Sequence, residues 1–468
     1  MKNKLPLFLV LFFFGLNQIL AQTEINMSYK DFLENVKRNN PIARTANNFG
    51  EIGRIQYQAA RGNYDPVLSG SAESKFYRST SYYDVIEAGI KQPIFTSQYL
   101  KMGYEYGSGN YVNPEQATSS FGLPYVGLEV SLLQGMVIDK RRAEVLKSRS
   151  YVNYYQSEQN IILNNLLFES ARFYFDWLFA EKQFALHSHF YNLAKFRLYG
   201  IEALAVSGER PTVDTIEAVI YMQSRMLDQQ SAAIEKSKKL NELLNLNWKN
   251  DFSPLDSSSN FIVTDSLDLY YSKSRNLLLV LMLQDSLNNP IIDQYKAKQG
   301  VLEVDQRLKR EMIKPRLDVS YNFLSNNANS YSPVFSTNSY KWGANLSFPL
   351  LMRNARNEYK LATLNVKNNQ NELNAKRNEI TMKHRFYRQS VSVLLNQLEN
   401  AERAVMYSKL LLEAERLKFD NGESSLFMLN TREGKLLESE LKLAEYKLKF
   451  LQLHLSFIHL NGSQNYIF

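Results

Sequence analysis

The sequence has no cysteine, and long parts of it have neither glycine nor proline. Because all 468 residues lack cysteine, disulfides, thiolate nucleophiles and thiolate metal sites are excluded, so packing, length or association must stabilise the chain. Glycine and proline are both missing from residues 136–199, 212–253 and 350–421. These stretches are rich in leucine, glutamate, lysine, glutamine, alanine and asparagine, most of which favour helices. At about 1.5 Å per residue they predict helices longer than a globular domain needs, as in a rod or a tunnel.

Apolar runs long enough to cross a bilayer as a helix are also missing beyond the N-terminus. The longest, residues 277–283, is far shorter than the roughly 20 residues that a spanning helix needs. A membrane location would therefore require a β-barrel, because only helices and closed barrels satisfy their backbone hydrogen bonds in lipid. Residues 1–21 are expected to be a signal peptide, since Lys2 and Lys4 precede a short apolar stretch that ends in the small residue Ala21.

Patterns that would indicate an enzyme, a cofactor or a nucleic-acid partner are absent as well. The net charge of +8 is spread thinly and forms no basic cluster of the kind that binds nucleic acid. His187 and His189 stand two positions apart on a predicted helix, so they face different sides and do not suit one metal ion. No phosphate-binding loop or catalytic arrangement stands out. We expect no enzyme, no cofactor and no metal site.

Short alternating segments lie between the long helical stretches. Residues 317–323 and 342–348 alternate apolar with small or polar side chains on either side of a loop rich in serine and asparagine, which predicts a hairpin. Residues 67–77 and 126–132 predict strands in the first half. One apolar and one polar face is typical of strands in an outer-membrane barrel, although a half-buried soluble sheet has the same alternation.

Two further strand-like segments, residues 85–92 and 100–107, have no counterpart in the second half. In residues 100–107, leucine, methionine and tyrosine alternate with charged residues or glycine. The two segments are either additional barrel strands or an enlarged extracellular hairpin, and we slightly favour the hairpin.

The chain is organised as a tandem repeat with an offset of 249 residues. Asn40-Pro41 recurs as Asn289-Pro290, and Pro66 recurs as Pro315. Each half is predicted to run helix, hairpin, long helix, tight turn and helix. The expected parts are a signal peptide (1–21), a first repeat (22–248), a polar linker (249–265), a second repeat (266–461) and a C-terminal tail (462–468).

The tight turns of the two halves are expected at residues 206–211 and 420–425. Each contains a glycine, Gly208 or Gly422, that is expected to adopt the left-handed conformation that ends a helix. Candidates to cap the helix that follows are Thr212 in the first half, and Ser424 or Ser425 in the second.

These features together resemble the TolC-type outer-membrane efflux family, the outer membrane factors. Residues 421–433 resemble the second tip turn of many members, and the resemblance covers essentially the whole mature chain. The other residues that carry it are the two Asn-Pro pairs, Pro66 and Pro315 before the strands, and the segments after the strands, which are residues 132–135 with 141–143, and residues 348–351.

The resemblance implies a mixed α/β membrane protein that forms a homotrimer and acts as a passive exit duct. Each chain would contribute four strands to one transmembrane β-barrel in outer-membrane lipid, and long helices to a periplasmic α-helical barrel. The tip turns would meet a periplasmic adaptor protein, which links the channel to the inner-membrane pump of a tripartite efflux or type I secretion system. The implied adaptor-contact residues at the tip are Ser207, Gly208, Asp214, Asn421, Gly422, Glu423, Ser424 and Ser425.

The closing contacts of the family are only partly matched. Asp214 stands where the family has its tip aspartate, but Ser424 replaces the arginine partner. Met428 and Thr431 occupy the positions of the acidic ring at the entrance, so neither the ion pair nor the ring is expected here. A hydrogen bond between Ser424 and Asp214 could replace the ion pair, and the alternative is a solvated Asp214 in the first helical turn.

Two other functions are open at this point. One is a soluble periplasmic coiled-coil scaffold, which the apolar stripes of the last helical segment would also suit. The other is a related channel devoted to exporting a protein through an ATP-driven system. The sequence does not identify the transported substrate or the energy source of the pump.

Overall fold

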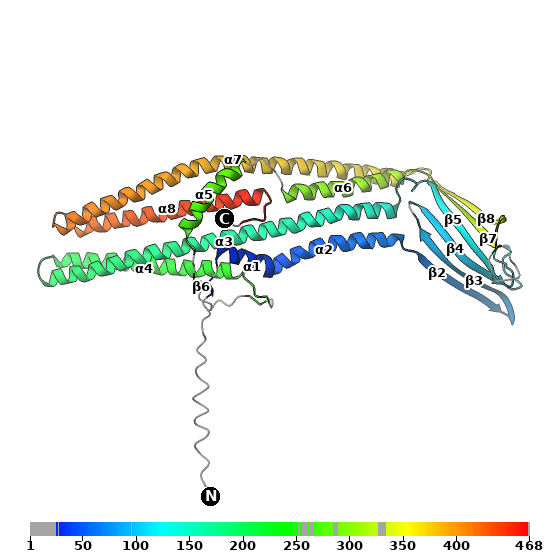
Figure 1. The fold of residues 1–468 in the computed structure, drawn as a ribbon, viewed down its shortest axis with the longest axis horizontal. Helices are drawn as coiled ribbons and strands as arrows, with labels where there is room; N and C mark the ends of the chain where they lie inside the picture. The colour runs from blue at the N-terminus through cyan, green and yellow to red at the C-terminus, as the bar shows by residue number, and fades with distance from the viewer. Residues whose placement is uncertain are drawn as a thin grey trace, which may run out of the picture. The chain divides into compact units, whose positions relative to one another are not determined.

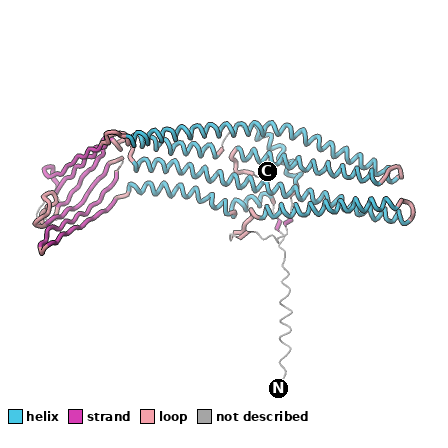
Figure 2. Tube along the Cα trace, turned by 180° about the vertical axis from the view of Figure 1, so that it is seen from behind, coloured by secondary structure: helices cyan, strands magenta, loops and turns pink. Residues whose placement is uncertain are grey.

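The computed structural model describes residues 25–26, 28–94, 96–250, 253–254, 261–262, 265–283, 289–325 and 334–466. The expected signal peptide (1–21) and most of the expected linker (249–265) lie outside the described residues. The chain separates into two compact units, whose helices and strands are drawn in Figures 1 and 2. The sheet unit comprises residues 47–159 and 290–378, and the helical unit comprises residues 1–46, 160–289 and 379–468.

Helices make up most of the chain, and two of them are very long. α3 (Lys140–Val206) has 67 residues and α7 (Arg353–Asp420) has 68, which confirms the long helices predicted from the missing glycine and proline. α4 (Thr212–Leu244) occupies most of the predicted stretch 212–253. The other helices are α1 (Tyr29–Asn39), α2 (Pro41–Arg61), the short 3-10 helix η1 (Gly62–Tyr64), α5 (Leu267–Leu283), α6 (Pro290–Glu311) and α8 (Leu426–Leu460).

The sheet unit contains one antiparallel sheet with the strand order β2-β3-β4-β5-β7-β8. The pairing of β5 with β7 joins strands from the two halves of the sequence, and β2 and β8 form the two edges of the sheet (Figure 1). The strands are β2 (Val67–Tyr77), β3 (Thr80–Pro93), β4 (Gln98–Ser108), β5 (Leu123–Leu133), β7 (Arg316–Ser325) and β8 (Phe335–Ser347), and a separate short parallel pair is formed by β1 (Ile25–Asn26) and β6 (Phe261–Ile262).

The hairpin interpretation of residues 85–92 and 100–107 is wrong. These residues lie within β3 and β4, which stand between β2 and β5, so the chain contributes six strands to the sheet rather than the four that the resemblance implied. The physical reason is that their alternation continues that of the neighbouring strands. Met102 on β4, for example, pairs with Ile90 on β3 and with Val126 on β5, which places three apolar side chains side by side on one face.

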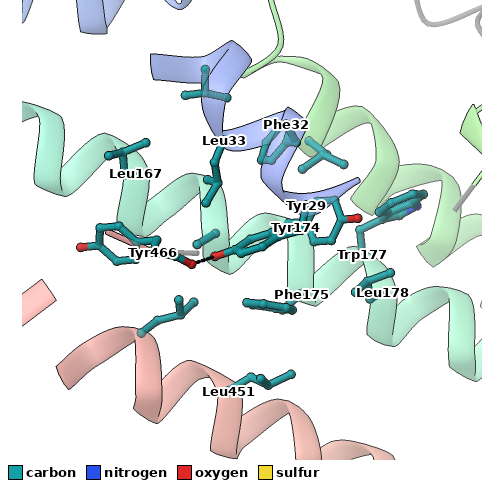
Figure 3. Close-up of a cluster of buried hydrophobic side chains, with 14 of the residues drawn as sticks. Tyr29, Phe32, Leu33, Leu167, Tyr174, Phe175, Trp177, Leu178, Leu451 and Tyr466 are labelled. Atoms are coloured by element: carbon teal, nitrogen blue, oxygen red, sulfur yellow. Dashed lines mark hydrogen bonds between the residues drawn. The ribbon is translucent and has the colours of Figure 1, made fainter. Parts of the chain in front are cut away.

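The helical unit has a core of aromatic and aliphatic side chains from α1, α3, α5, α8 and the residues after α8 (Figure 3). Phe175 is fully buried there, and the rings of Tyr29 and Tyr174 lie 5.1 Å apart. The carboxylate of Asp265 accepts hydrogen bonds from the Tyr29 backbone N–H at 3.0 Å, the Tyr174 hydroxyl at 3.0 Å and the Tyr270 hydroxyl at 2.7 Å. The polar groups inside this apolar core therefore have hydrogen-bond partners, as buried polar groups generally do.

The two Asn-Pro pairs make the same contact in the helical unit. Nδ2 of Asn40 donates to the carbonyl oxygen of Leu246, just beyond the end of α4, at 3.0 Å. Nδ2 of Asn289 donates to the carbonyl oxygen of Leu460, the last residue of α8, at 2.8 Å. The prolines that follow begin α2 and α6, where a missing N–H costs nothing. Each pair therefore joins the end of one helix to the start of another.

Candidate functional site

The sheet has one apolar face and one polar face. Residues paired across antiparallel strands lie on the same face, so the register assigns each side chain to a face. The apolar face carries Leu68, Ile86, Ile90, Met102, Leu128, Val130, Val319, Phe323, Trp342 and Leu346, and the polar face carries Ser69, Ser71, Glu87, Lys91, Lys101, Glu105, Glu129, Asp318, Ser320, Asn322 and Asn345.

The apolar face is uncovered in the single chain. Leu68 is 77% exposed, Leu346 66% and Trp342 65%. Exposing apolar surface to water costs about 25 cal/mol per Å². Large contiguous apolar patches on a protein therefore mark a surface that meets a partner or a membrane. The alternation predicted from the sequence is observed. The apolar face of the sheet is not covered by other parts of the described chain, so it is suited to contact with a partner or a membrane.

On the polar face, opposite charges pair across the sheet, both between neighbouring strands and between strands that are not adjacent. Lys91 on β3 and Lys101 on β4 both contact the carboxylate of Glu129 on β5, and Nζ of Lys91 lies 3.1 Å from its Oε2. Nζ of Lys341 on β8 lies 3.8 Å from Oε2 of Glu105 on β4. Such pairs favour this register over others. A face of paired charges, serine and asparagine is suited to contact with water.

Two turns with the same backbone geometry join the long helices of the helical unit in pairs, and both lie at the same end of that unit (Figures 1 and 2). Gly208 after α3 has a φ of +77° and Gly422 after α7 has a φ of +78°, which confirms the predicted left-handed conformation. The N–H groups of Glu209 and Glu423 each donate to the carbonyl oxygen five residues earlier, at 2.9 and 2.8 Å. This is the Schellman motif that closes a helix.

The helices after these turns begin in different ways. Oγ of Ser425 accepts a hydrogen bond from the backbone N–H of Met428 at 3.3 Å and caps α8, which confirms one of the two predicted caps in the second half. In the first half Pro211 occupies the cap position with an extended backbone and makes no side-chain cap bond. Thr212 as a cap is therefore wrong, because it is already the first residue of α4.

The hydrogen bond suggested between Ser424 and Asp214 is not formed within the described chain. Oγ of Ser424 donates to Oε1 of Glu415 on α7 at 2.5 Å, and Nε of Arg432 on α8 lies 3.5 Å from the other carboxylate oxygen. The Ser424 hydroxyl, followed by Arg432, lowers the pKa of the Glu415 carboxyl. Asp214 lies in the first turn of α4, with Oδ2 3.9 Å from Nη1 of Arg210.

The other expected tip residues lie on the surface of the two turns. Ser207, Asn421 and Glu423 are exposed, as are Ser425 and both glycines. Among the described residues, no other side chain or distant backbone atom lies within 4 Å of the position that a Cβ would take at either glycine. Exposed apolar side chains flank the turns as well, including Val206 at 91% and Phe427 at 63%. The tip therefore combines exposed polar groups with exposed apolar area.

Arg210, which no pattern in the sequence singles out, joins the two turns of the tip. Nη2 of Arg210 donates to the carbonyl oxygen of Phe419 at 3.3 Å, and its guanidinium carbon lies 4.5 Å from the centre of the Phe419 ring. This cation–π contact ties the turn after α3 to the end of α7. The arginine was visible in the sequence, but its partner is 209 residues away, which no local pattern indicates.

A second missed group, the Arg197 cluster, links α3, α4 and α8. The guanidinium of Arg197 contacts the carboxylate of Glu433, with Nη1 3.0 Å from Oε2, and donates to Oδ1 of Asn430 at 2.8 Å. The Tyr221 hydroxyl donates to the same Oε2 at 3.4 Å, and burial, followed by Glu433, raises the pKa of Tyr221 to about 12. Because Glu433 is buried, removing Arg197 would leave an unpaired charge out of water.

The described residues form neither a metal site nor a membrane-spanning helix. Within the described part of the chain, no group of histidine, aspartate and glutamate is placed to hold a metal ion. Among the same residues, no helix has both the length and the apolar character needed to cross a membrane.

The arrangement of helices and strands is that of several outer-membrane proteins of known structure. The chain is similar to the outer membrane channel CmeC of Campylobacter jejuni, with a TM-score of 0.64 and 15% identity over 93% of this chain and 86% of that chain. It is similar to the outer membrane protein VceC of Vibrio cholerae, with a TM-score of 0.65 and 12% identity over 93% and 96%. It is also similar to the open state of the outer membrane channel MtrE of Neisseria gonorrhoeae, with a TM-score of 0.57 and 16% identity over 93% and 89%.

The sequence itself gives no such match. No family model matches it, and no curated protein matches it. The similarity is therefore one of fold, because at 12–16% sequence identity the comparison of sequences alone gives no match. The chain has the TolC-like fold of outer-membrane channels, which confirms the fold that the resemblance implied.

Proposed function

We propose that the protein is a subunit of an outer-membrane efflux channel and acts as a passive exit duct without chemistry of its own. The fold supports this, because CmeC and MtrE are outer membrane channels rather than enzymes. In this proposal the energy for transport comes from an inner-membrane pump, and the channel supplies a path through the outer membrane.

The observation that carries the proposal is the two-faced sheet with its uncovered apolar side. In an outer-membrane barrel the apolar face, with Leu68 and Trp342, meets lipid, and the polar face, with Lys101 and Glu129, meets water in the lumen. The edge strands β2 and β8 leave backbone groups that cannot stay unpaired in lipid. Pairing β2 of one copy with β8 of the next would close a barrel shared by several copies, and the resemblance to the TolC-type family sets the proposed number at three.

The two tip turns are the proposed contact with a periplasmic adaptor. Their exposed polar residues can donate and accept hydrogen bonds, and exposed Val206 and Phe427 supply apolar area of the kind found at the centre of interfaces. The proposed contact residues are Ser207, Gly208, Asp214, Asn421, Gly422, Glu423, Ser424 and Ser425. The adaptor would connect the channel to the pump of an efflux or type I secretion system.

The channel proposal is tested with the full-length protein in membranes. We expect it to resist extraction by carbonate, to require detergent for solubility, to have the mass of a trimer and to conduct ions in planar bilayers. A soluble periplasmic coiled-coil scaffold would be released by carbonate and would give no conductance. That result would overturn the proposal.

The adaptor contact is tested by crosslinking in cells. A photoreactive residue at Asn421, in the second tip turn, should give an adduct with a periplasmic protein. The matched control is the same residue at Lys238, which is also exposed but lies near the far end of α4. Adducts of the same protein from both positions, or none from Asn421, would contradict the proposed contact.

A further inference from the structure

A cavity of about 740 Å³ lies in the sheet unit, where the helices meet the strands. Its walls come from the end of α2, the residues before β2, the end of β3 and the first turns of α3. A volume of this size is within the range of small-ligand sites. The polar side chains that line it are Tyr57, Gln58, Arg61, Tyr64, Asp65, Gln92 and Arg142.

The cavity begins where the apolar face of the sheet ends. Gln92, in the cavity wall, lies two residues after Ile90 on β3, so the two side chains share a face about 7 Å apart. Ile90 is 39% exposed, and its partner Leu68 on β2 is 77% exposed. Ile94, which also lines the cavity, is 48% exposed. An exposed apolar surface therefore runs from the sheet into a cavity that is lined by both apolar and polar side chains.

The charges of the cavity include both signs. Arg61 is exposed at the end of α2, and neither its guanidinium nor the Asp65 carboxylate forms an ion pair with any residue that the structure describes. Arg142 is fixed by a hydrogen bond from Nη1 to the carbonyl oxygen of Val137 at 3.2 Å. Two guanidinium groups match the oxygens of a phosphate, and a nearby carboxylate matches an ammonium group.

We propose that this cavity binds the headgroup of a membrane phospholipid that carries an ammonium group, such as phosphatidylethanolamine. Arg61 and Arg142 contact the phosphodiester, Asp65 contacts the ammonium, and the acyl chains lie on the apolar face along Leu68 and Ile90. The inference rests on the proposed function, because the apolar face must be in lipid. In that setting the cavity lies at the level of the headgroups of the leaflet on the helix side of the sheet.

The test uses the full-length protein in detergent, titrated with phosphatidylethanolamine and followed by native mass spectrometry. Arg61→Gln should lower the affinity about tenfold or more, because it removes a charge-assisted hydrogen bond. The matched control is Arg54→Gln, two turns earlier on α2, where the guanidinium pairs with Glu51 at 2.6 Å outside the cavity. This control should bind lipid like the unaltered protein.

Two further variants separate the parts of the site. Val145→Trp should fill the cavity and weaken binding without changing any charge. Asp65→Asn should remove the preference for phosphatidylethanolamine over phosphatidylglycerol, because the lost carboxylate is the partner of the ammonium group. Equal lipid binding by Arg61→Gln and Arg54→Gln would overturn the inference.

Soluble competitors distinguish a lipid site from a site for a free anion. Inorganic phosphate and phosphoethanolamine should compete poorly with the lipid, since they lack the acyl chains that contact the apolar face. Competition at concentrations equal to that of the lipid would overturn the lipid assignment. If the protein is a conducting trimer but Arg61→Gln binds phosphatidylethanolamine as well as the unaltered protein does, only this inference is overturned. If the protein is instead a monomer that is soluble without detergent, the proposed function itself is overturned.

Discussion

The helical unit and the sheet unit treat their apolar side chains in opposite ways. In the helical unit Phe175 and Leu451 are fully buried in one aromatic and aliphatic core (Figure 3). In the sheet unit Leu68 and Leu346 stand on a regular apolar face and are mostly exposed. The helical unit buries this core within one chain, although Phe196 and Val206 on its helices remain exposed, whereas the sheet unit leaves one whole face of its sheet exposed. The difference teaches that the sheet is built for surroundings other than water.

Emptying the core of the helical unit should have the largest effect on stability. Phe175→Ala removes a fully buried ring and should lower the free energy of unfolding by about 3–5 kcal/mol, because the site loses its packing contacts. Loss of helical circular dichroism on heating in detergent measures the change. Phe196→Ala, on the same helix but 80% exposed, is the matched control. Equal losses for both variants would contradict the contrast between buried and exposed apolar residues.

Placing a charge on the apolar face of the sheet should have the next largest effect, and only where lipid is present. Leu128→Arg should cost up to about 2–4 kcal/mol if the residue lies near the bilayer centre. Ser320→Arg is the control, because Ser320 pairs with Glu129 on the opposite face at the same level of the sheet. The fraction of protein that resists protease after insertion into vesicles measures the effect. If both variants insert equally well, the apolar face is not a lipid contact.

Acidification should weaken the helical unit through a buried histidine. Burial lowers the pKa of His454 on α8 to about 4, while an unfolded histidine titrates near 6.5. The unfolded state therefore binds more protons below pH 6.5, so this contribution to stability is complete above pH 6.5 and is lost as the pH falls towards about 4. The loss is at most about 3 kcal/mol.

Melting temperatures between pH 7 and pH 4.5 measure this contribution. His454→Leu should flatten the pH dependence, whereas His189→Leu, at an exposed position on α3, should leave it as it is. An unchanged slope in His454→Leu would show that other groups cause the acid sensitivity.

The smallest effect on stability is expected at the second tip turn. A substitution there should reduce function much more than it reduces the free energy of unfolding. Gly422→Val forces a β-branched residue into a left-handed conformation at a cost of about 1–2 kcal/mol. The space around the glycine is open, so the cost is confined to the backbone. Adaptor crosslinking or efflux should fall while trimers still assemble. Gly422→Asn, which tolerates this conformation, should stay close to normal. Normal efflux by Gly422→Val would argue against a role of this turn.

Much of the fold follows from local sequence rules. Stretches without glycine and proline predict most of α3 and all of α7, although α3 continues through Gly200. Gly208 and Gly422 mark the helix ends, because only glycine takes the left-handed conformation without cost. The strand-like pattern of residues 67–77 coincides with β2, and the alternating residues 317–323 lie within β7, whereas β8 begins at Phe335, well before the predicted segment 342–348. These features depend on backbone preferences of neighbouring residues, which the sequence displays directly.

Other features depend on contacts between distant residues, and the sequence does not display them. The alternation of residues 100–107 showed a strand but not its neighbours, so the place of β4 in the sheet was missed. The contacts of Arg210 with Phe419 and of Arg197 with Glu433 join helices that are far apart in the chain. A hydroxyl residue near a helix start, such as Thr212, predicts a cap, but Pro211 already has the extended backbone of the cap position that precedes α4.

The absence of cysteine allows one direct measurement of the central claim, that the apolar face of the sheet contacts lipid. A fluorescent label is attached to a single cysteine introduced as Leu128→Cys or as Ser320→Cys, and the protein is placed in vesicles. The label at 128 should be quenched by phospholipids with brominated acyl chains and protected from aqueous iodide, and the label at 320 should show the reverse. Quenching of both labels by iodide, with no effect of brominated lipid on either, would contradict the account.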